Sequence, residues 1–519
     1  SLLVIIFVQS LAIYSTPMKK HFFRIIFLIL TVFVVNDIKA ANVLGGDTAF
    51  IRTYGGVNFE EFRDIVQTPD SGFLMCGITN GYGQGSNAIY VVKTTKTGEH
   101  EWSKAFGGVS PDLAYSVAIN NSGNYFIAGT SSSGGNGGYD GYLICLDVSG
   151  TILWEKYYGG SDWDFIYSVE VMPDQSILLA GESYSFSNGG TDAWVLHLNS
   201  SGDTTWTNNF GSTGNDAFKN ICQSPTAIYL SGYIDSTDAD GMDGYLIKLD
   251  LTGNFVWEKR VHLLGRDLLN GCTIDQSGDL IAYGSTAPFD STKNDALVTK
   301  LDTNSTVIWS YNSASGEDDD AKKIIPISNN ELFLIGQKNP SGNGAKSIFM
   351  TRYNSSGFSV NGGQSFGGPN DEEGYSMINT IQGGVAIVGY TSSYGLGNSD
   401  ALLVYLNSDS SVTAPVVYSL VSFTETLSPI GIEETNDDLN FSIYPNPTSG
   451  VVTIQIKDKS PLSRILAYDL MGKCVNELKD LSNSEINFVS LTDNSEGVYF
   501  IKIEFENGSN RSFRILKVK

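Results

Sequence analysis

A glycine that closes an apolar segment recurs about every 52 residues along most of this chain. The seven glycines are Gly77, Gly129, Gly181, Gly232, Gly284, Gly336 and Gly389, and the intervals between them are 52, 52, 51, 52, 52 and 53 residues. A fixed period of this length is typical of repeat architectures, in which one unit cannot bury its apolar face alone. The sequence therefore predicts seven equivalent units packed against their neighbours.

Each unit contains four short strand-like segments. In the third unit these are Phe165–Met172, Ile177–Ala180, Ala193–Leu198 and Thr204–Phe210, separated by turn-forming residues. Short apolar or alternating segments with such boundaries indicate antiparallel strands. Four strands in each of seven units predict an all-β fold, a seven-bladed β-propeller over residues 48–407. A β-solenoid is the main alternative, although the period is long for one.

The two ends of the array favour a closed ring. A tryptophan marks the fourth strand of five units, at Trp102, Trp154, Trp206, Trp257 and Trp309. The seventh unit ends at Leu406 without a fourth strand, whereas Phe50-Ile51-Arg52-Thr53-Tyr54-Gly55-Gly56 has its pattern, with Phe50 in the tryptophan position. We expect Phe50–Tyr54 to complete the last blade, which removes two exposed sheet edges. The sixth unit departs from the pattern, with Gly362 in the tryptophan position.

Residues 1–41 predict an export leader. A basic segment from Met18 to Arg24 precedes an apolar run, Ile25–Val35, and Lys39-Ala40-Ala41 offers small residues for cleavage. Met18 is the expected start of translation. A membrane anchor is the alternative, but the run is about half of the roughly 20 residues that cross a bilayer. We therefore expect secretion, with no membrane span after cleavage.

Composition and motif content exclude several functions. The net charge of −24 would repel phosphate backbones, so nucleic acid is not an expected partner. The five cysteines and four histidines form no CxxC or zinc spacing, and no Ser-His-Asp, HExxH or phosphate-loop pattern is present. We expect neither an enzyme nor a bound cofactor. A polysaccharide hydrolase or lyase is the alternative, because the separation of two carboxylates cannot be read from a sequence.

Acidic residues recur at two positions of the repeat. One set opens the first strands, at Glu60, Asp112, Asp164, Asp216, Asp267, Asp319 and Glu372. A second set opens the third strands, at Asp140, Asp192, Asp243, Asp295 and Asp400, and is absent from units one and six. We expect the first set to accept backbone N–H bonds in the turn that enters each blade. A ring that binds a cation or a polar ligand is the alternative.

One loop breaks the pattern and is the candidate metal site. Asp238, Asp240 and Asp243 cluster around a glycine turn, and carboxylate oxygens are ligands for calcium. The loop lacks the spacing of an EF-hand and its terminal glutamate. The alternative is a solvated acidic loop.

The repeat units resemble a family of bacterial extracellular β-propeller repeats. The residues that carry this resemblance are the Asp-rich unit start, the glycine-ended second strand and third strands such as Asp140–Asp147 and Asp243–Asp250. The resemblance covers roughly Ala49 to Asn407. It implies a fold and no particular activity.

Beyond the repeat array, the sequence predicts a polar linker over residues 408–438 and a second domain over residues 439–519. Its expected strands are Val451–Lys457, Ser463–Asp469, Ile486–Leu491, Gly497–Phe505 and Ser512–Val518. This length and pattern predict a small β-sandwich.

The second domain resembles the type A C-terminal sorting domain of the type IX secretion system of Bacteroidota. The residues that carry the resemblance are Tyr444, Pro445, Asn446, Pro447, Gly450, Gly472, Gly497, Tyr499, Lys517 and Lys519. It implies the secretion machinery as a partner, export to the outer cell surface, and usually removal of the signal with attachment to lipopolysaccharide. A purely structural sandwich is the alternative. We therefore expect a secreted surface protein whose propeller is a binding or scaffold module for an extracellular glycan or protein.

Overall fold

The computed structural model describes residues 49–407 and 441–517 with short gaps. The gaps are 236–240, 264, 289–292, 314–316, 328–329, 340–344, 361–362, 445–447, 457–461, 470–472, 480–485, 493, 496 and 506–509. The predicted leader and linker lie outside the described residues. Within the described part, the structure has no helix long and apolar enough to cross a membrane.

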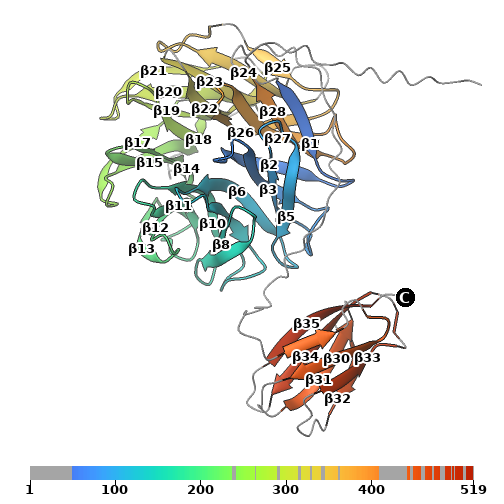
Figure 1. The fold of residues 1–519 in the computed structure, drawn as a ribbon. Helices are drawn as coiled ribbons and strands as arrows, with labels where there is room; N and C mark the ends of the chain where they lie inside the picture. The colour runs from blue at the N-terminus through green and yellow to red at the C-terminus, as the bar shows by residue number, and fades with distance from the viewer. Residues whose placement is uncertain are drawn as a thin grey trace, which may run out of the picture. The chain divides into compact units, whose positions relative to one another are not determined.

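Residues 50–406 form seven antiparallel four-stranded sheets arranged as blades around an axis (Figure 1). Blades one to three are β2 (Glu60–Gln67), β3 (Phe73–Thr79), β4 (Ala88–Thr94) and β5 (His100–Phe106); β6 (Asp112–Ile119), β7 (Tyr125–Ser131), β8 (Asp140–Leu146) and β9 (Ile152–Tyr158); β10 (Asp164–Val171), β11 (Ile177–Ser183), β12 (Asp192–Leu198) and β13 (Thr204–Phe210). Blades four and five are β14 (Ala217–Ser224), β15 (Ala227–Asp235), β16 (Met242–Leu249) and β17 (Phe255–Val261); β18 (Gly265–Ile274), β19 (Leu280–Pro288), β20 (Asp295–Leu301) and β21 (Val307–Asn312). Blade six is β22 (Asp318–Ile327), β23 (Glu331–Asn339), β24 (Ser347–Tyr353) and β25 (Gln364–Phe366). The predicted seven-bladed propeller is confirmed.

The ring closes as the sequence predicts. Blade seven consists of β26 (Glu372–Asn379), β27 (Val385–Thr391), β28 (Asp400–Leu406) and the N-terminal strand β1 (Phe50–Tyr54). Strand β1 pairs antiparallel with β28, with Phe50 opposite Tyr405 and Tyr54 opposite Ala401. The two ends of the array therefore share one sheet, which leaves no gap between the first blade and the last.

Every innermost strand contains a β-bulge at the same place. The register of each first strand shifts by one residue, and the residues left out of the pairing are Arg63, Tyr115, Tyr167, Lys219, Asn270, Lys322 and Tyr375. A bulge bends its strand and re-aims a side chain. Seven bulges therefore set one ring of large polar and aromatic side chains around the axis.

In five of the seven blades, the residue after the bulge ties neighbouring blades together through a side-chain hydrogen bond. Asp64 Oδ2 accepts a hydrogen bond of 3.0 Å from the Val117 N–H, in the next blade. Ser116 Oγ in turn accepts one of 3.2 Å from the Val169 N–H. Ser376 Oγ of blade seven donates to Asp64 Oδ1 over 2.7 Å, which carries this belt across the closure. Buried polar groups that are satisfied in this way fix the relative position of the blades.

The C-terminal domain consists of two antiparallel sheets. One contains β29 (Phe441–Tyr444), β30 (Val451–Ile456) and β33 (Ile486–Ser490), and the other contains β31 (Leu462–Asp469), β32 (Cys474–Leu478), β34 (Gly497–Phe505) and β35 (Asn510–Lys517). Apolar residues of both sheets, including Ile454, Val489, Ile465 and Ile501, share one core. The predicted β-sandwich is confirmed, and β29 and β32 are strands that the sequence pattern did not reveal.

Candidate functional site

The acids that open the first strands serve the turns that enter their own blades, as expected. Their carboxylates accept hydrogen bonds from backbone N–H groups four residues earlier, at distances including 2.9 Å for Glu60 with Gly56 and 2.8 Å for Asp164 with Gly160. The same bond is present at Asp112, Asp216, Asp267 and Glu372. Since six units share this geometry, it explains the repetition without a ligand. We call the side of the propeller that carries these acids the acid face.

The second set of acids pairs with the first across blade junctions. A Cβ atom added to Gly159 would lie 2.3 Å from an oxygen of Asp140 and 2.7 Å from one of Asp164, in the next blade. The glycine of the repeated aromatic-Gly-Gly pattern is therefore required by two carboxylates on either side of it. Burial, followed by the charge of Asp164, raises the pKa of Asp140. Burial and the charge of Asp216 likewise raise the pKa of Asp192.

One of these junctions carries a histidine in the glycine position. His262 Nδ1 lies 2.6 Å from Asp243 Oδ1, and one ligand atom from each of Asp243, His262 and Asp267 lies within 4.8 Å of the others. Of the predicted calcium ligands, Asp238 and Asp240 lie outside the described residues. The structure therefore adds an imidazole and a second carboxylate to Asp243, and calcium binding stays a prediction.

The axial ring has mixed charge and is asymmetric. The guanidinium carbon of Arg63 lies 4.1 Å from the centre of the Tyr375 ring, and Lys219 Nζ lies 3.5 Å from the centre of the Tyr167 ring. Such contacts between a cation and an aromatic face are attractive. Burial lowers the pKa of Lys219. The sequence offered no sign of this ring, because the bulge positions differ in residue type from unit to unit.

Aromatic side chains form a row on the acid face, from the loops of blades two and three to the axis. The successive ring centres are 6.5 Å apart for Tyr184 and Trp163, 5.9 Å for Trp163 and Tyr139, 5.5 Å for Tyr139 and Phe165, 6.2 Å for Phe165 and Tyr167, and 5.2 Å for Tyr167 and Tyr115. Trp163 is 50% exposed and Tyr184 is 40% exposed. We call these six residues the aromatic row.

Polar groups flank the aromatic row near the axis. Tyr167 donates a hydrogen bond from its hydroxyl to Glu182 Oε1, and Tyr233 donates to Glu182 Oε2 over 3.2 Å. Burial raises the pKa of Tyr115 to about 12, so its hydroxyl stays protonated at neutral pH. The row therefore combines apolar ring faces with fixed hydrogen-bonding groups and the nearby cation of Lys219.

The structure describes five of the ten predicted sorting residues. Tyr444 ends β29 and Gly497 begins β34, while Gly450 follows the turn ahead of β30. Tyr499 is buried and donates to the Ser495 carbonyl over 2.7 Å. Lys517 is buried too, and its Nζ donates to the Thr492 carbonyl over 3.0 Å. Pro445, Asn446, Pro447, Gly472 and Lys519 lie outside the described residues.

Comparison with known families identifies the C-terminal segment. Residues 442–517 match the family described as the secretion system C-terminal sorting domain. This part of the chain is therefore a sorting domain, as its resemblance implied. No curated protein matches the sequence of the chain.

Several solved structures are similar to the chain at low sequence identity. An extracellular domain assigned to a one-component system of B. thetaiotaomicron is 12% identical with a TM-score of 0.40, and the match covers 90% of this chain but only 60% of that one. Polysaccharide lyase Uly1 is 11% identical with a TM-score of 0.41, covering 72% and 94%. YCF48 bound to D1 peptide is 10% identical with a TM-score of 0.40, covering 72% and 98%. At this level of similarity, no activity carries over to this chain.

Proposed function

We propose that this protein, which carries a secretion-system sorting domain at residues 442–517, is a non-catalytic surface protein whose propeller binds an extracellular glycan. The aromatic row is the binding surface. The sorting domain supports secretion, and the propeller is the part that remains to interact with the surroundings of the cell. Export through the type IX machinery of Bacteroidota and attachment to surface lipopolysaccharide belong to the same proposal.

The single observation that carries the proposal is the exposure of large aromatic rings at the loop end of a row that leads to the axis. Exposed Trp and Tyr at one place are uncommon on soluble proteins unless they contact a partner. Trp163 and Tyr184 offer flat apolar faces, on which the apolar side of a sugar ring can stack. The row continues inward without a break to Tyr167 and Tyr115. An extended chain of sugar rings fits such a row better than a compact ligand does.

Hydrogen-bonding groups at the inner end would give the site its specificity. Ligand sites are lined mainly by apolar and aromatic side chains, with a few fixed polar groups that orient the ligand. Glu182 is buried and accepts hydrogen bonds from Tyr167 and Tyr233, so it fixes these two tyrosines in place at the inner end of the row. Lys219 above the Tyr167 ring supplies a cation for an acidic sugar.

A protein partner is the second candidate, favoured by the same residue types. Tyr, Trp and Arg are enriched at protein interfaces, where a few such side chains contribute most of the binding energy. The flat, exposed end of the row at Trp163 and Tyr184 would suit such a contact. The glycan is preferred because the row leads into a polar axial ring and does not remain on the outer surface.

The test is affinity electrophoresis of the protein in gels that contain individual polysaccharides, comparing wild type with Trp163→Ala and Tyr167→Ala. We expect a retarding polysaccharide to lose at least tenfold in affinity in both variants. Phe255→Ala is the matched control, because Phe255 is 55% exposed and lies on β17. Equal retardation of all four proteins would contradict the proposal. Release of oligosaccharide products would favour the hydrolase or lyase alternative.

A further inference from the structure

Two cysteines on the innermost strands of neighbouring blades lie against each other. Cys222 belongs to β14 of blade four and Cys272 to β18 of blade five, and their Sγ atoms are 2.6 Å apart. Carbon atoms in non-bonded contact lie about 3.5–4.0 Å apart, and sulfur is larger than carbon. The two sulfur atoms are therefore too close for two separate thiol groups in ordinary contact.

A hydrogen bond between the same two strands fixes the backbone around these cysteines. The Cys272 N–H donates to Asn220 Oδ1 over 3.1 Å. Side chains two positions apart in a strand point to the same face, so Cys222 faces blade five together with Asn220. Both cysteines also belong to the apolar core between these blades, which includes Tyr229 and Leu269. The short distance between the sulfur atoms therefore agrees with the position of the two strands.

The other blade junctions show that these two strand positions meet throughout the propeller. Cys222 is the third residue after the bulge of its strand, and Cys272 is the second residue after the bulge of the next. The equivalent residues share a core at four other junctions, as the pairs Val66 and Val117, Ala118 and Val169, Ile325 and Met377, and Ile378 and Ile65. Cysteine occupies both positions at the junction of blades four and five and at none of the other junctions.

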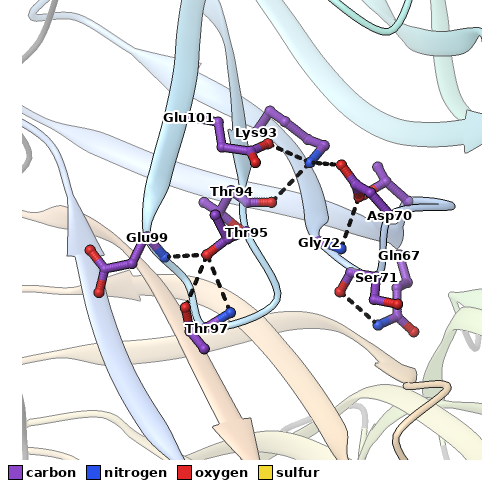
Figure 2. A network of polar contacts seen from close by, with 11 residues as sticks. Gln67, Asp70, Ser71, Gly72, Lys93, Thr94, Thr95, Thr97, Glu99 and Glu101 are labelled. Carbon is purple, nitrogen blue, oxygen red and sulfur yellow. Dashed lines mark hydrogen bonds and ion pairs between the residues drawn. The ribbon is translucent and has the colours of Figure 1, made fainter.

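Side chains carry the contact between blades, whereas backbone hydrogen bonds and local polar contacts hold each blade together. In blade one, Lys93 Nζ donates to Asp70 Oδ2 over 2.8 Å and to Glu101 Oε2 over 2.6 Å (Figure 2). Neighbouring blades form separate sheets, and among the described strands no backbone ladder joins β14 to β18. A covalent bond between these two strands would therefore act at a contact that the backbone does not hold.

We propose that Cys222 and Cys272 form a disulfide bond that links blades four and five of the exported protein and stabilises the propeller. Disulfide bonds form and persist in compartments outside the cytosol, and the sorting domain at residues 442–517 supports export of this chain. The proposal depends on export and is independent of glycan binding by the aromatic row. Because the two cysteines are 50 positions apart, their spacing in the sequence does not reveal them as partners.

The oxidant for this bond is the disulfide of a thiol oxidoreductase. The thiolate of one cysteine attacks that disulfide and forms a mixed disulfide, and the thiolate of the other cysteine then displaces the reduced oxidant. The S–S bond between Cys222 and Cys272 forms, and two protons and two electrons pass to the oxidant, which leaves as two thiols. Burial raises the pKa of the Cys222 thiol, so we expect the attack before the two blades have packed.

Peptide mapping of the full-length protein exported by its native host tests the bond directly. Free thiols are alkylated in denaturant without reductant, and the protein is then digested with trypsin. We expect residues 220–248 to be linked to residues 267–293 and to separate from them after reduction. Buried Cys145 is the internal control and should be alkylated without reductant. The proposal is overturned if Cys222 and Cys272 are alkylated without reductant, or if either is linked to a different cysteine.

Two variants test whether the bond stabilises the propeller. Each exported protein is unfolded and refolded with and without dithiothreitol, and its melting temperature is then measured. We expect dithiothreitol to lower the melting temperature of wild type by at least about 3 °C, because a disulfide restricts the unfolded chain. This difference should vanish in Cys222→Ala and remain in Cys145→Ala, the matched control at a buried cysteine. A difference that is absent from wild type, or that persists in Cys222→Ala, would overturn the stabilising role of the bond.

Discussion

The ring of Phe50 stacks on that of Tyr405, with the ring centres 5.3 Å apart and the planes inclined by 15°. The two residues are 355 positions apart in the sequence and face each other in the pairing of β1 with β28. Phe50 is 7% exposed and belongs to a core that includes Phe73 and Tyr90 of blade one. The closing strand therefore joins blade seven to blade one through side chains as well as through its backbone.

Replacing Phe50 with alanine should destabilise the propeller strongly. The substitution leaves a cavity in the core shared by blades one and seven, and large-to-small changes of Phe cost about 3–5 kcal/mol. Urea unfolding followed by tryptophan fluorescence measures the loss. Phe255→Ala serves as a control, because exposed positions change stability by about 0.5 kcal/mol or less. A loss below about 1 kcal/mol at Phe50 would contradict closure through this residue.

The paired acids should make stability depend on pH in a defined direction. Burial and the charge of Asp216 raise the pKa of Asp192, so at a pH between the unfolded and folded pKa values the folded protein holds a proton there that the unfolded chain has released. This contribution to stability is complete below the unfolded pKa near 4 and is lost as the pH rises through the raised folded value. Asp192→Asn removes the repulsion. The melting temperature of this variant relative to wild type should therefore increase from pH 4 to pH 8.

Asp250 is a control, because its pKa is shifted in the opposite direction to that of Asp192. Hydrogen bonds from Thr252 and Asn254 lower the pKa of Asp250 to about 2. Its carboxylate therefore adds stability at neutral pH that is lost as the pH falls towards 2, and Asp250→Asn should be less stable than wild type at pH 7. If the difference between Asp192→Asn and wild type is the same at every pH, the proposed repulsion between the acid pairs does not exist.

The sequence predicted the repeat, the number of blades and the closing strand because these depend on positions that recur in every unit. The fixed glycine, the tryptophan and the acids are such positions. The axial ring could not be predicted, because bulges are set by strand pairing and the residues at them range from Arg63 to Tyr375.

The burial of the cysteines could also be predicted only in part from the sequence. A chain whose cysteines show no disulfide spacing is expected to bury them as small apolar residues. Cys76, Cys145 and Cys272 are buried, whereas Cys222 is only partly buried and Cys474 is exposed. Cys474 begins β32, which lies at the edge of its sheet, and sheet position cannot be read from residue type.

Calcium should bind at Asp238, Asp240 and Asp243 if the carboxylate density of this loop reflects a ligand site. Calorimetry at millimolar calcium should then show heat for wild type that is lost in Asp240→Ala. His262→Ala separates calcium from other metals, because calcium prefers oxygen ligands whereas zinc accepts imidazole. Calcium binding should survive this change and zinc binding should not. The absence of heat with calcium would contradict the prediction.

Removing residues 437–519 should change the location of the protein and leave its propeller folded. The propeller closes with β1 and β28 and needs no strand from the sorting domain. The truncated protein should accumulate in the periplasm of the native host, and the full-length protein should reach the surface. Fractionation with an antibody to the propeller distinguishes the two, and surface display of the truncated protein would contradict export by the sorting domain.

The central claim is that the propeller recognises a glycan through the aromatic row, and a glycan array probed with residues 42–519 tests it most directly. We expect a restricted set of related glycans to bind the wild-type protein, and the same set to be lost with Trp163→Ala but kept with Phe255→Ala. Binding that is absent from the whole array, or that is unchanged by Trp163→Ala, would contradict the claim and favour a protein partner.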